Sequence, residues 1–255
     1  MALYGSTRGS RRWSYNERAI AKESRSRDGL ALGRSTIGWE GDALVVRIDE
    51  RQTPFGGLFH GGAIRGTVVF RPEYGGGEAH ALDERGDHLW WPVAPAGRAE
   101  VAFEEPSLRF AGHGYHDANA GRVPLEESFS RWTWSRARLG AGTAITYDAM
   151  TKDGRLAASR VAMVASHRGV EALSNAESFA LPTSRWQLER RAQSDRGRAP
   201  TLHRSLEDGP FYARDLVSAS FHGERVLSVH ETLSLDRWRA PWVRGLAAFK
   251  CGSAR

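Results

Sequence analysis

Short runs of alternating polar and apolar residues, separated by glycine-containing turns, follow one another along most of this chain. Runs of this kind form strands, and their spacing of roughly 8–12 residues is typical of antiparallel β structure. Asp153-Gly154, which lies between two of the runs, is a common hairpin turn. The sequence therefore predicts strands at Ala43–Ile48, Ala63–Phe70, His88–Val93, Ala99–Phe103, Phe129–Ser135, Thr143–Ala149, Ala158–Ala165, Phe211–Phe221 and Arg225–Leu235.

Helical periodicity is weak by comparison. Asn16–Glu23 and Arg239–Phe249 are the two segments whose pattern favours a short helix. We therefore predict an all-β fold of antiparallel barrels or sandwiches with few short helices. Predicted strands lie on both sides of the segment 112–124, so we expect two β-domains, residues 1–122 and 123–255.

The length and composition limit the class of protein to which the chain can belong. With 255 residues, of which 40% are hydrophobic and 26% charged, the chain is long enough to bury a core. The single cysteine, Cys251, excludes an internal disulfide and a cysteine-based zinc site. The first residues lack the apolar run of a secretory signal, and no run is long enough to span a bilayer. We expect a soluble or peripheral protein of a reducing compartment.

The net charge of +6 comes mainly from arginine. A basic balance favours an acidic partner, either nucleic acid or an anionic membrane surface. The arginines are spread along the chain, apart from a group in the first forty residues, and no nucleic-acid fold signature accompanies them. We therefore expect a solvated basic surface and no nucleic-acid partner.

One stretch, residues 110–126, is unusually polar for a chain of this pattern, with two histidines, a tyrosine and an aspartate close together. If it is a strand, Tyr115 and Asp117 point to one face and His116 points to the other. By the same rule His88 and Trp90, which lie upstream, share a face. The two pairs are the candidate site.

The chemistry expected of these residues is acid catalysis beside aromatic rings. Burial among rings raises the pKa of an aspartate, so that Asp117 could stay protonated and act as a general acid. His88 could orient Asp117 or relay its proton, and Trp90 and Tyr115 could stabilise a carbocation through their π faces. In the alternative interpretation, Asp117 caps a turn with Asn119 and Gly121, and the rings only fill the core.

Other kinds of site fit the sequence less well. His113 and His116, with Asp117, resemble part of a metal site, but on opposite sides of one strand they do not converge, so no metal is expected. No Gly-x-Ser-x-Gly elbow or Gly-x-Gly-x-x-Gly loop occurs in the context of a hydrolase or a nucleotide-binding fold. The nine tryptophans are compatible with an aromatic-lined β-barrel for an apolar ligand, although core packing explains most of them by default.

The chain resembles the carotenoid 1,2-hydratase (hydroxyneurosporene synthase) family over nearly its whole length. Gly-Tyr-His-Asp and His-x-Trp at this separation are its most specific motifs. The stretches that carry the resemblance are Ala2-Leu-Tyr-Gly, Arg12-Trp13, Leu30–Glu50 with Trp39-Glu-Gly-Asp-Ala-Leu, His88-Leu-Trp-Trp-Pro-Val, Phe110–Glu126, Trp132-Thr-Trp-Ser-Arg136, Tyr147-Asp148, Glu231-Thr-Leu-Ser-Leu-Asp-Arg and Pro241–Lys250.

The resemblance implies a hydro-lyase that adds water, without a cofactor, to the terminal C1–C2 double bond of an acyclic carotenoid such as neurosporene or lycopene. It also implies two lipocalin-like β-domains and a bacterial cytoplasmic location, in contact with the inner or photosynthetic membrane. The family's catalytic aspartate and tyrosine fall on Asp117 and Tyr115, and its histidine and tryptophan fall on His88 and Trp90.

Two differences from the family pattern bear on these expectations. Family members carry residues upstream of the Ala-Leu-Tyr-Gly stretch, so the first domain is expected to be shortened at its start. Alanines at 118 and 120 replace bulkier residues of relatives and are expected to enlarge the pocket or to reduce activity. The alternatives to a hydratase are a non-catalytic carotenoid- or lipid-binding lipocalin-like protein and a related terpenoid isomerase or cyclase.

Overall fold

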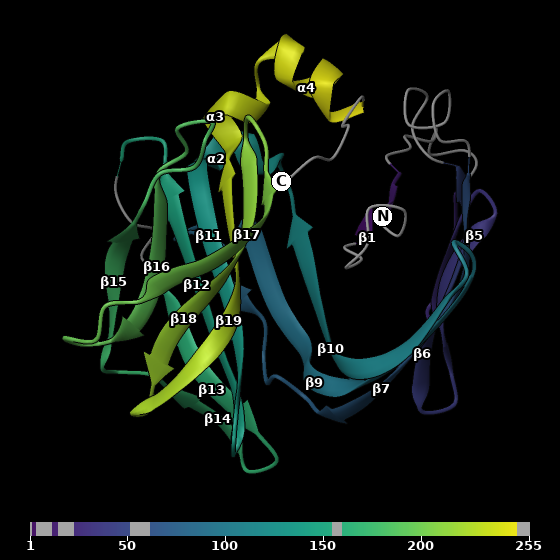
Figure 1. Ribbon diagram of the computed structural model, residues 1–255, viewed down its shortest axis with the longest axis horizontal. Helices are drawn as coiled ribbons and strands as arrows, with labels where there is room; N and C mark the ends of the chain where they lie inside the picture. Colours follow the sequence, from purple (N-terminus) through teal and green to yellow (C-terminus); the bar gives the residue numbers. More distant parts are fainter. Residues whose placement is uncertain (1, 4–11, 15–22, 52–61, 155–159, 249–255) are drawn as a thin grey trace. The chain divides into compact units, whose positions relative to one another are not determined.

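The computed structural model describes residues 2–3, 12–14, 23–51, 62–154 and 160–248. These residues form antiparallel sheets with a few short helices, which confirms the predicted all-β class (Figure 1). The described residues contain no helix with the length and apolar character needed to cross a membrane.

The first large sheet has eight strands in the order β10-β9-β7-β6-β5-β4-β3, with β8 paired to β9 outside this path. A separate pair, β1 and β2, precedes it. The strands are β1 (Ala2–Leu3), β2 (Arg12–Trp13), β3 (Glu23–Arg25), β4 (Gly29–Leu32), β5 (Ser35–Glu40), β6 (Ala43–Arg51), β7 (Ala63–Tyr74), β8 (His80–Ala81), β9 (His88–Glu105) and β10 (Leu108–Gly121).

The second large sheet has seven strands in the order β14-β13-β12-β11-β19-β18-β17, and β15 pairs with β16 in a small sheet. The elements are α2 (Leu125–Ser128), β11 (Phe129–Leu139), β12 (Gly142–Thr151), β13 (Val161–Ser166), β14 (Gly169–Ala172), β15 (Ala176–Leu181), β16 (Arg190–Asp195), β17 (Thr201–Asp208), β18 (Tyr212–Phe221), β19 (Glu224–Ser234), α3 (Leu235–Trp238) and α4 (Pro241–Ala248).

By their internal contacts the residues form two compact units, each assembled from separate segments. Unit 1 comprises residues 1–73, 97–115 and 244–253, and unit 2 comprises 74–96, 116–243 and 254–255. The long strands β9 and β10 each contribute to both units. The division into domains 1–122 and 123–255 stays a prediction.

Most predicted strands are present, with shifts that have local causes. His88–Val93 and Ala99–Phe103 are parts of one strand, β9, rather than two. The last predicted strand ends at Ser234 instead of Leu235, because the Ser234 hydroxyl accepts a hydrogen bond from the Arg237 backbone N–H and caps α3. Gly154, at a φ of 81°, forms the predicted turn after β12.

The remaining differences between prediction and structure lie next to residues that the structure does not describe. β13 begins at Val161, whereas the predicted strand began at Ala158, which is not among the described residues. Of the predicted helix Asn16–Glu23 only Glu23 is described, and it begins β3. The helix predicted over Arg239–Phe249 is confirmed as α4.

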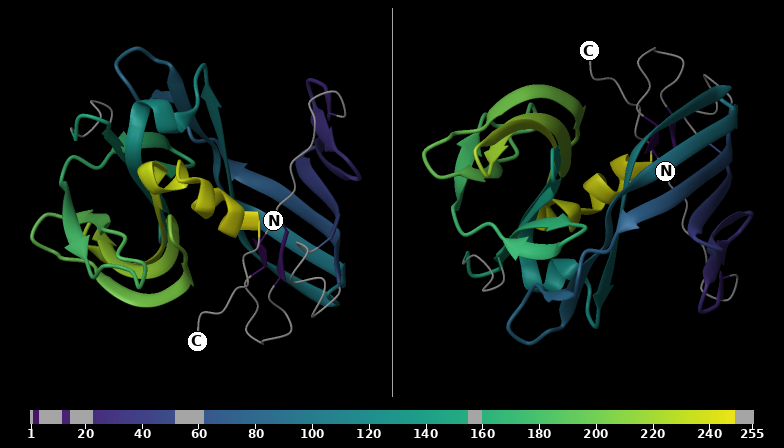
Figure 2. Two further views of the ribbon diagram at one scale, coloured as in Figure 1. Left: turned by 90° about the horizontal axis from the view of Figure 1, so that it is seen from above. Right: turned by 90° about the horizontal axis from the view of Figure 1, so that it is seen from below.

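The sheet of unit 2 has two different faces. On one face, β16 packs against β11, β18 and β19 and covers a core that includes Ala137, Phe221 and Val217. Figure 2 shows the green and yellow-green strands of this unit as a curved layer. Tyr147, Trp134 and Glu231 occupy the opposite face, because side chains alternate along each strand. The site lies on this second face.

Candidate functional site

Trp90 and Asp117 form the centre of the candidate site, and both belong to unit 2. The alternation predicted for β9 is confirmed, because His88 and Trp90 are buried whereas Leu89 and Trp91 are exposed. Trp90 has no exposed surface, and its indole N–H donates a hydrogen bond to Oδ2 of Asp117 over 2.9 Å. The structure therefore brings together two of the four predicted site residues.

Asp117 lies inside strand β10 and not in a turn. Its observed bond to Trp90 on β9 also differs from the turn-capping arrangement with Asn119 and Gly121, so that alternative is wrong for this residue. Tyr115 precedes Asp117 by two positions on the same strand and is half-buried, as the strand pattern predicts. It ends the segment of unit 1, and its role beside Trp90 stays a prediction.

His88 has different partners from those expected. Its backbone N–H donates to Oδ2 of Asp83, and its Nε2 lies 2.8 Å from the hydroxyl of Ser128 at the end of α2. The imidazole also packs against the ring of Phe129, with a centroid separation of 5.1 Å. These contacts fix the ring between the start of β9 and the start of β11.

The other side of the His88 ring faces the end of β10. A Cβ atom at Gly121 would come within 2.9 Å of Nδ1, so the ring needs a glycine there. Gly121 lies four residues beyond Asp117, which corresponds to about 13 Å of extended strand. The His88 ring thus lies beside the end of β10, well beyond the position of the Trp90–Asp117 bond. Its side chain binds Ser128 instead of the predicted partner Asp117.

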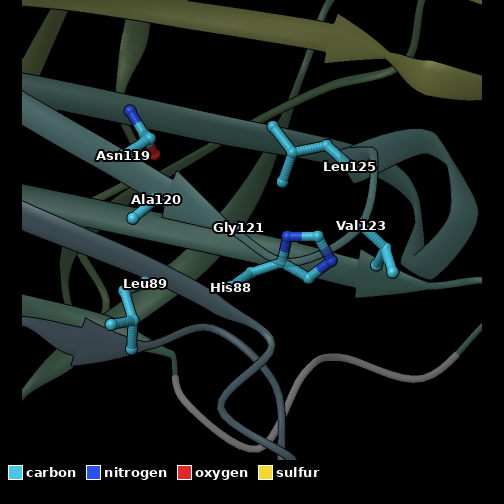
Figure 3. Close-up of a pocket in the computed structure, with 7 residues that line it drawn as sticks. All are labelled: His88, Leu89, Asn119, Ala120, Gly121, Val123 and Leu125. Atoms are coloured by element: carbon cyan, nitrogen blue, oxygen red, sulfur yellow. The ribbon is translucent and has the colours of Figure 1, made fainter. Parts of the chain in front are cut away.

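His88 lines a small pocket of about 150 Å³ in unit 2 (Figure 3). Most of its wall is aliphatic, and the Asn119 amide and the imidazole supply the polar atoms. Ala120, one of the two alanines expected to enlarge the pocket, is part of the wall. The full lining is His88, Leu89, Asn119, Ala120, Gly121, Val123 and Leu125.

Tyr147 is a site residue that the sequence reasoning did not select. Its ring lies 5.4 Å from that of Trp90 and 5.8 Å from that of Trp132, with which it stacks. Burial raises the pKa of the Tyr147 phenol, and the carboxylates of Asp117 and Glu231 raise it further. Tyr147 is therefore a neutral hydroxyl next to the Trp90–Asp117 pair.

The signal that could have identified Tyr147 was the hairpin of β11 and β12. In its register Trp134 lies opposite Tyr147, which places the ring-bearing positions of both strands on one face. Both strands were predicted from the sequence, but the register between them was not.

This arrangement can support acid chemistry on an apolar molecule. Because the Trp90 N–H is a donor, Oδ2 of Asp117 serves as an acceptor, and a proton on the carboxyl group would be carried by Oδ1. The ring of Trp90, which binds this carboxyl group, packs against Tyr147, and Tyr147 stacks on Trp132. Aromatic faces of this kind attract positive charge. Within the described part of the chain no three His, Cys, Asp or Glu side chains gather as metal ligands would.

The sequence of this chain is similar to that of known proteins. The family described as carotenoid hydratase CrtC matches residues 1–254. An acyclic carotenoid 1,2-hydratase from Thiocapsa roseopersicina is 36% identical over 98% of this chain and 60% of its own length. The enzyme of the same name from Rubrivivax gelatinosus is 37% identical over 93% of this chain and 57% of its own length. The chain thus spans less than two thirds of these two relatives.

A solved structure is similar in fold alone. The crystal structure of a candidate AttH protein from Nitrosomonas europaea covers 84% of this chain and 72% of its own, with a TM-score of 0.58 and 12% sequence identity. The likeness identifies the architecture as lipocalin-like, as expected.

Proposed function

The chain belongs to the carotenoid hydratase CrtC family, and on that basis we propose that it adds water to the terminal C1–C2 double bond of an acyclic carotenoid such as neurosporene or lycopene. The observation that supports this most directly is the Trp90–Asp117 hydrogen bond within an aromatic cluster. Both the acid and the rings that the reaction needs are present at one place.

Protonation of the alkene is the first step. The acid form of Asp117 delivers its proton to C2, and the π electrons form the new C–H bond. The positive charge develops on the tertiary carbon C1. Its stabilisation dominates the barrier, so the position of the rings relative to the acid decides the rate. Trp90 supplies a π face and also holds the carboxyl group in place, while Tyr115 is the second predicted ring.

Capture of the cation by water completes the reaction and gives the tertiary alcohol. The contacts of His88 with Ser128 and Gly121 support a role in shaping the neighbouring pocket, where part of the substrate chain could be held. This sequence of steps needs no redox cofactor, because addition of water changes no oxidation state overall.

The substrate class also bears on location. An acyclic carotenoid partitions into the bilayer, so we propose that the protein works in the bacterial cytoplasm at the inner or photosynthetic membrane. The positive net charge of +6 favours approach to anionic lipid head groups.

The test is expression of this chain in a bacterial host that makes lycopene or neurosporene, followed by mass analysis of the pigments. We expect a product heavier by one water, absent for Asp117→Asn and retained for Asp49→Asn. Asp49 is a suitable control because it is a strand aspartate paired with Arg34 in unit 1. Unchanged carotene with folded protein would favour a binding protein, and a product of unchanged mass would favour an isomerase or cyclase.

A further inference from the structure

A second carboxylate belongs to the same face of the unit 2 sheet as Tyr147. Tyr147 on β12 lies opposite Trp134 on β11, and Trp134 lies opposite Glu231 on β19. Directly opposed residues of neighbouring antiparallel strands project to the same side. Tyr147, Trp134 and Glu231 therefore form a row across three neighbouring strands. Glu231 is two strands away from Tyr147 in this row, at a backbone separation of about 10 Å.

The row continues with a charged partner for Glu231. Arg214 on β18 lies opposite Glu231, and its Nη2 donates to Oε1 of that carboxylate. The guanidinium is itself held by Tyr212, whose hydroxyl accepts a hydrogen bond from Nε over 3.0 Å. The Glu231 side chain is only 16% exposed, so its ion pair with Arg214 is largely shielded from solvent, unlike a typical surface ion pair.

Two carboxylates thus flank the aromatic cluster. Asp117 is on the β10 side, bonded to Trp90, and Glu231 is on the β19 side, bonded to Arg214. Tyr147 connects the two, because its ring packs against that of Trp90, which binds Asp117, and its strand position lies in the same row as Glu231. Addition of water uses a proton donor and a proton acceptor, and the second carboxylate on this face can supply the acceptor.

We propose that Glu231 accepts the proton of the water that attacks C1, with Arg214 orienting its carboxylate and Tyr147 lying between it and the acid. This inference rests on the proposed hydration. Water oxygen forms the bond to C1, one water proton passes to Glu231, and the tertiary alcohol remains. Glu231 then returns its proton to solvent, and Asp117 takes one from solvent, so that one water is consumed in each cycle.

Hydrogen exchange separates the two carboxylates experimentally. In D2O the acid delivers deuterium to C2, and a cation that is not captured reverts by losing hydrogen from C2 to Asp117, which leaves deuterium in the recovered carotene. With Glu231→Gln we expect hydration to fall about 100-fold or more while deuterium uptake continues. With Asp117→Asn we expect both hydration and deuterium uptake to be lost.

Glu224→Gln is the matched control, because it makes the same change on β19 at a position whose carboxylate accepts from the Gly140 backbone N–H. It should hydrate at the wild-type rate. Hydration by Glu231→Gln at a rate within twofold of wild type would overturn the proposal. Loss of both hydration and exchange in a folded Glu231→Gln protein would also overturn it, since the role would then be structural.

Failure of the proposed hydration itself has a different signature. In that case the folded wild-type chain forms no hydrated product and incorporates no deuterium, and the role of Glu231 falls with it. Uptake of deuterium by the carotene with Asp117→Asn would show that Asp117 is not the acid. The role of Glu231 would then be decided by the hydration rate of Glu231→Gln alone.

Discussion

The indole N–H of Trp90 donates to Oδ2 of Asp117 over 2.9 Å, from a side chain that has no exposed surface. The tryptophan therefore has two separable functions. Its N–H binds the Asp117 carboxyl group, and its ring packs against the ring of Tyr147. Substitution by phenylalanine removes the first function and preserves most of the second.

We predict that Trp90→Phe lowers the rate of hydration by about 10–100-fold, which corresponds to loss of a hydrogen bond of about 1.5–3 kcal/mol to a charged or polar acceptor. Product formation by purified protein with emulsified carotene measures the change. Trp91→Phe is the control, since Trp91 is 45% exposed and its N–H donates instead to the Gly77 carbonyl. Equal rates for Trp90→Phe and wild type would show that the ring alone matters.

Gly121 offers a test of the His88 position. Gly121→Ala places a methyl group within 2.9 Å of Nδ1 of the buried ring, so the imidazole or the strand must shift. We expect a loss of about 1–3 kcal/mol in the free energy of unfolding and lower hydration activity. Urea unfolding followed by tryptophan fluorescence gives the first quantity.

Gly112→Ala is the matched variant on the same strand, because its Cβ would meet no atom within 4 Å. It should change the free energy of unfolding by less than about 0.5 kcal/mol. If both variants behave alike, the close fit between Gly121 and His88 does not hold the ring in place.

Much of the fold follows from alternation along the sequence, because burial of one face of a sheet requires it. The same rule paired His88 with Trp90 and Tyr115 with Asp117, and the bond between Trp90 and Asp117 joins one residue from each pair. The sequence predicted two strands, 88–93 and 99–103, where the structure has the single strand β9, and Gly97 lies between them inside that strand. A Cβ at Gly97 would come within 2.3 Å of Phe70, so the glycine there is a packing requirement and not a turn.

Partners that are far apart in the sequence could not be predicted in this way. Ser128, which binds His88, is forty residues away in sequence, and the register of β11 with β19 joins positions about a hundred residues apart. Such pairings depend on the order and register of the strands in the whole sheet, which the local pattern of polar and apolar residues does not determine. Tyr147 and Glu231 both lie in stretches that resemble the family, but the local pattern does not predict that they are neighbours of the site.

The Tyr147 phenol should influence stability at alkaline pH. Its pKa is raised in the folded protein, first by burial and then by Asp117 and Glu231, whereas in the unfolded chain it is about 10. Its contribution to the free energy of unfolding is therefore complete below pH 10 and is lost as the pH rises further. We expect Tyr147→Phe to unfold with a weaker dependence on pH above 10 than wild type, as measured by urea unfolding between pH 9 and 11.

Tyr212→Phe serves as the comparison for Tyr147→Phe, because it removes the hydroxyl that binds Arg214 at a half-buried position. It should keep the alkaline loss of stability seen in wild type. An unchanged pH dependence in Tyr147→Phe would contradict the burial of a neutral phenol at the site.

On the opposite face of the sheet, His230 should control stability at acid pH. The ring is completely buried between the hydroxyls of Ser135 and Thr232. Burial lowers the pKa of His230 to about 3, and the positive charge of Arg190 acts in the same direction. In the unfolded chain the pKa is about 6.5, so between these two values the unfolded state binds the extra proton and the free energy of unfolding falls as the pH decreases.

The slope expected from this single group approaches about 1.4 kcal/mol per pH unit between pH 6 and 4. His230→Gln retains a polar side chain for the Ser135 and Thr232 hydroxyls but cannot titrate, so its free energy of unfolding should vary less steeply over that interval. His222→Gln is the control, since His222 is 48% exposed and lies near Glu171. Urea unfolding at half-unit steps from pH 7 to 4 measures all three proteins, and parallel curves for wild type and His230→Gln would show that the ring is not held neutral by the fold.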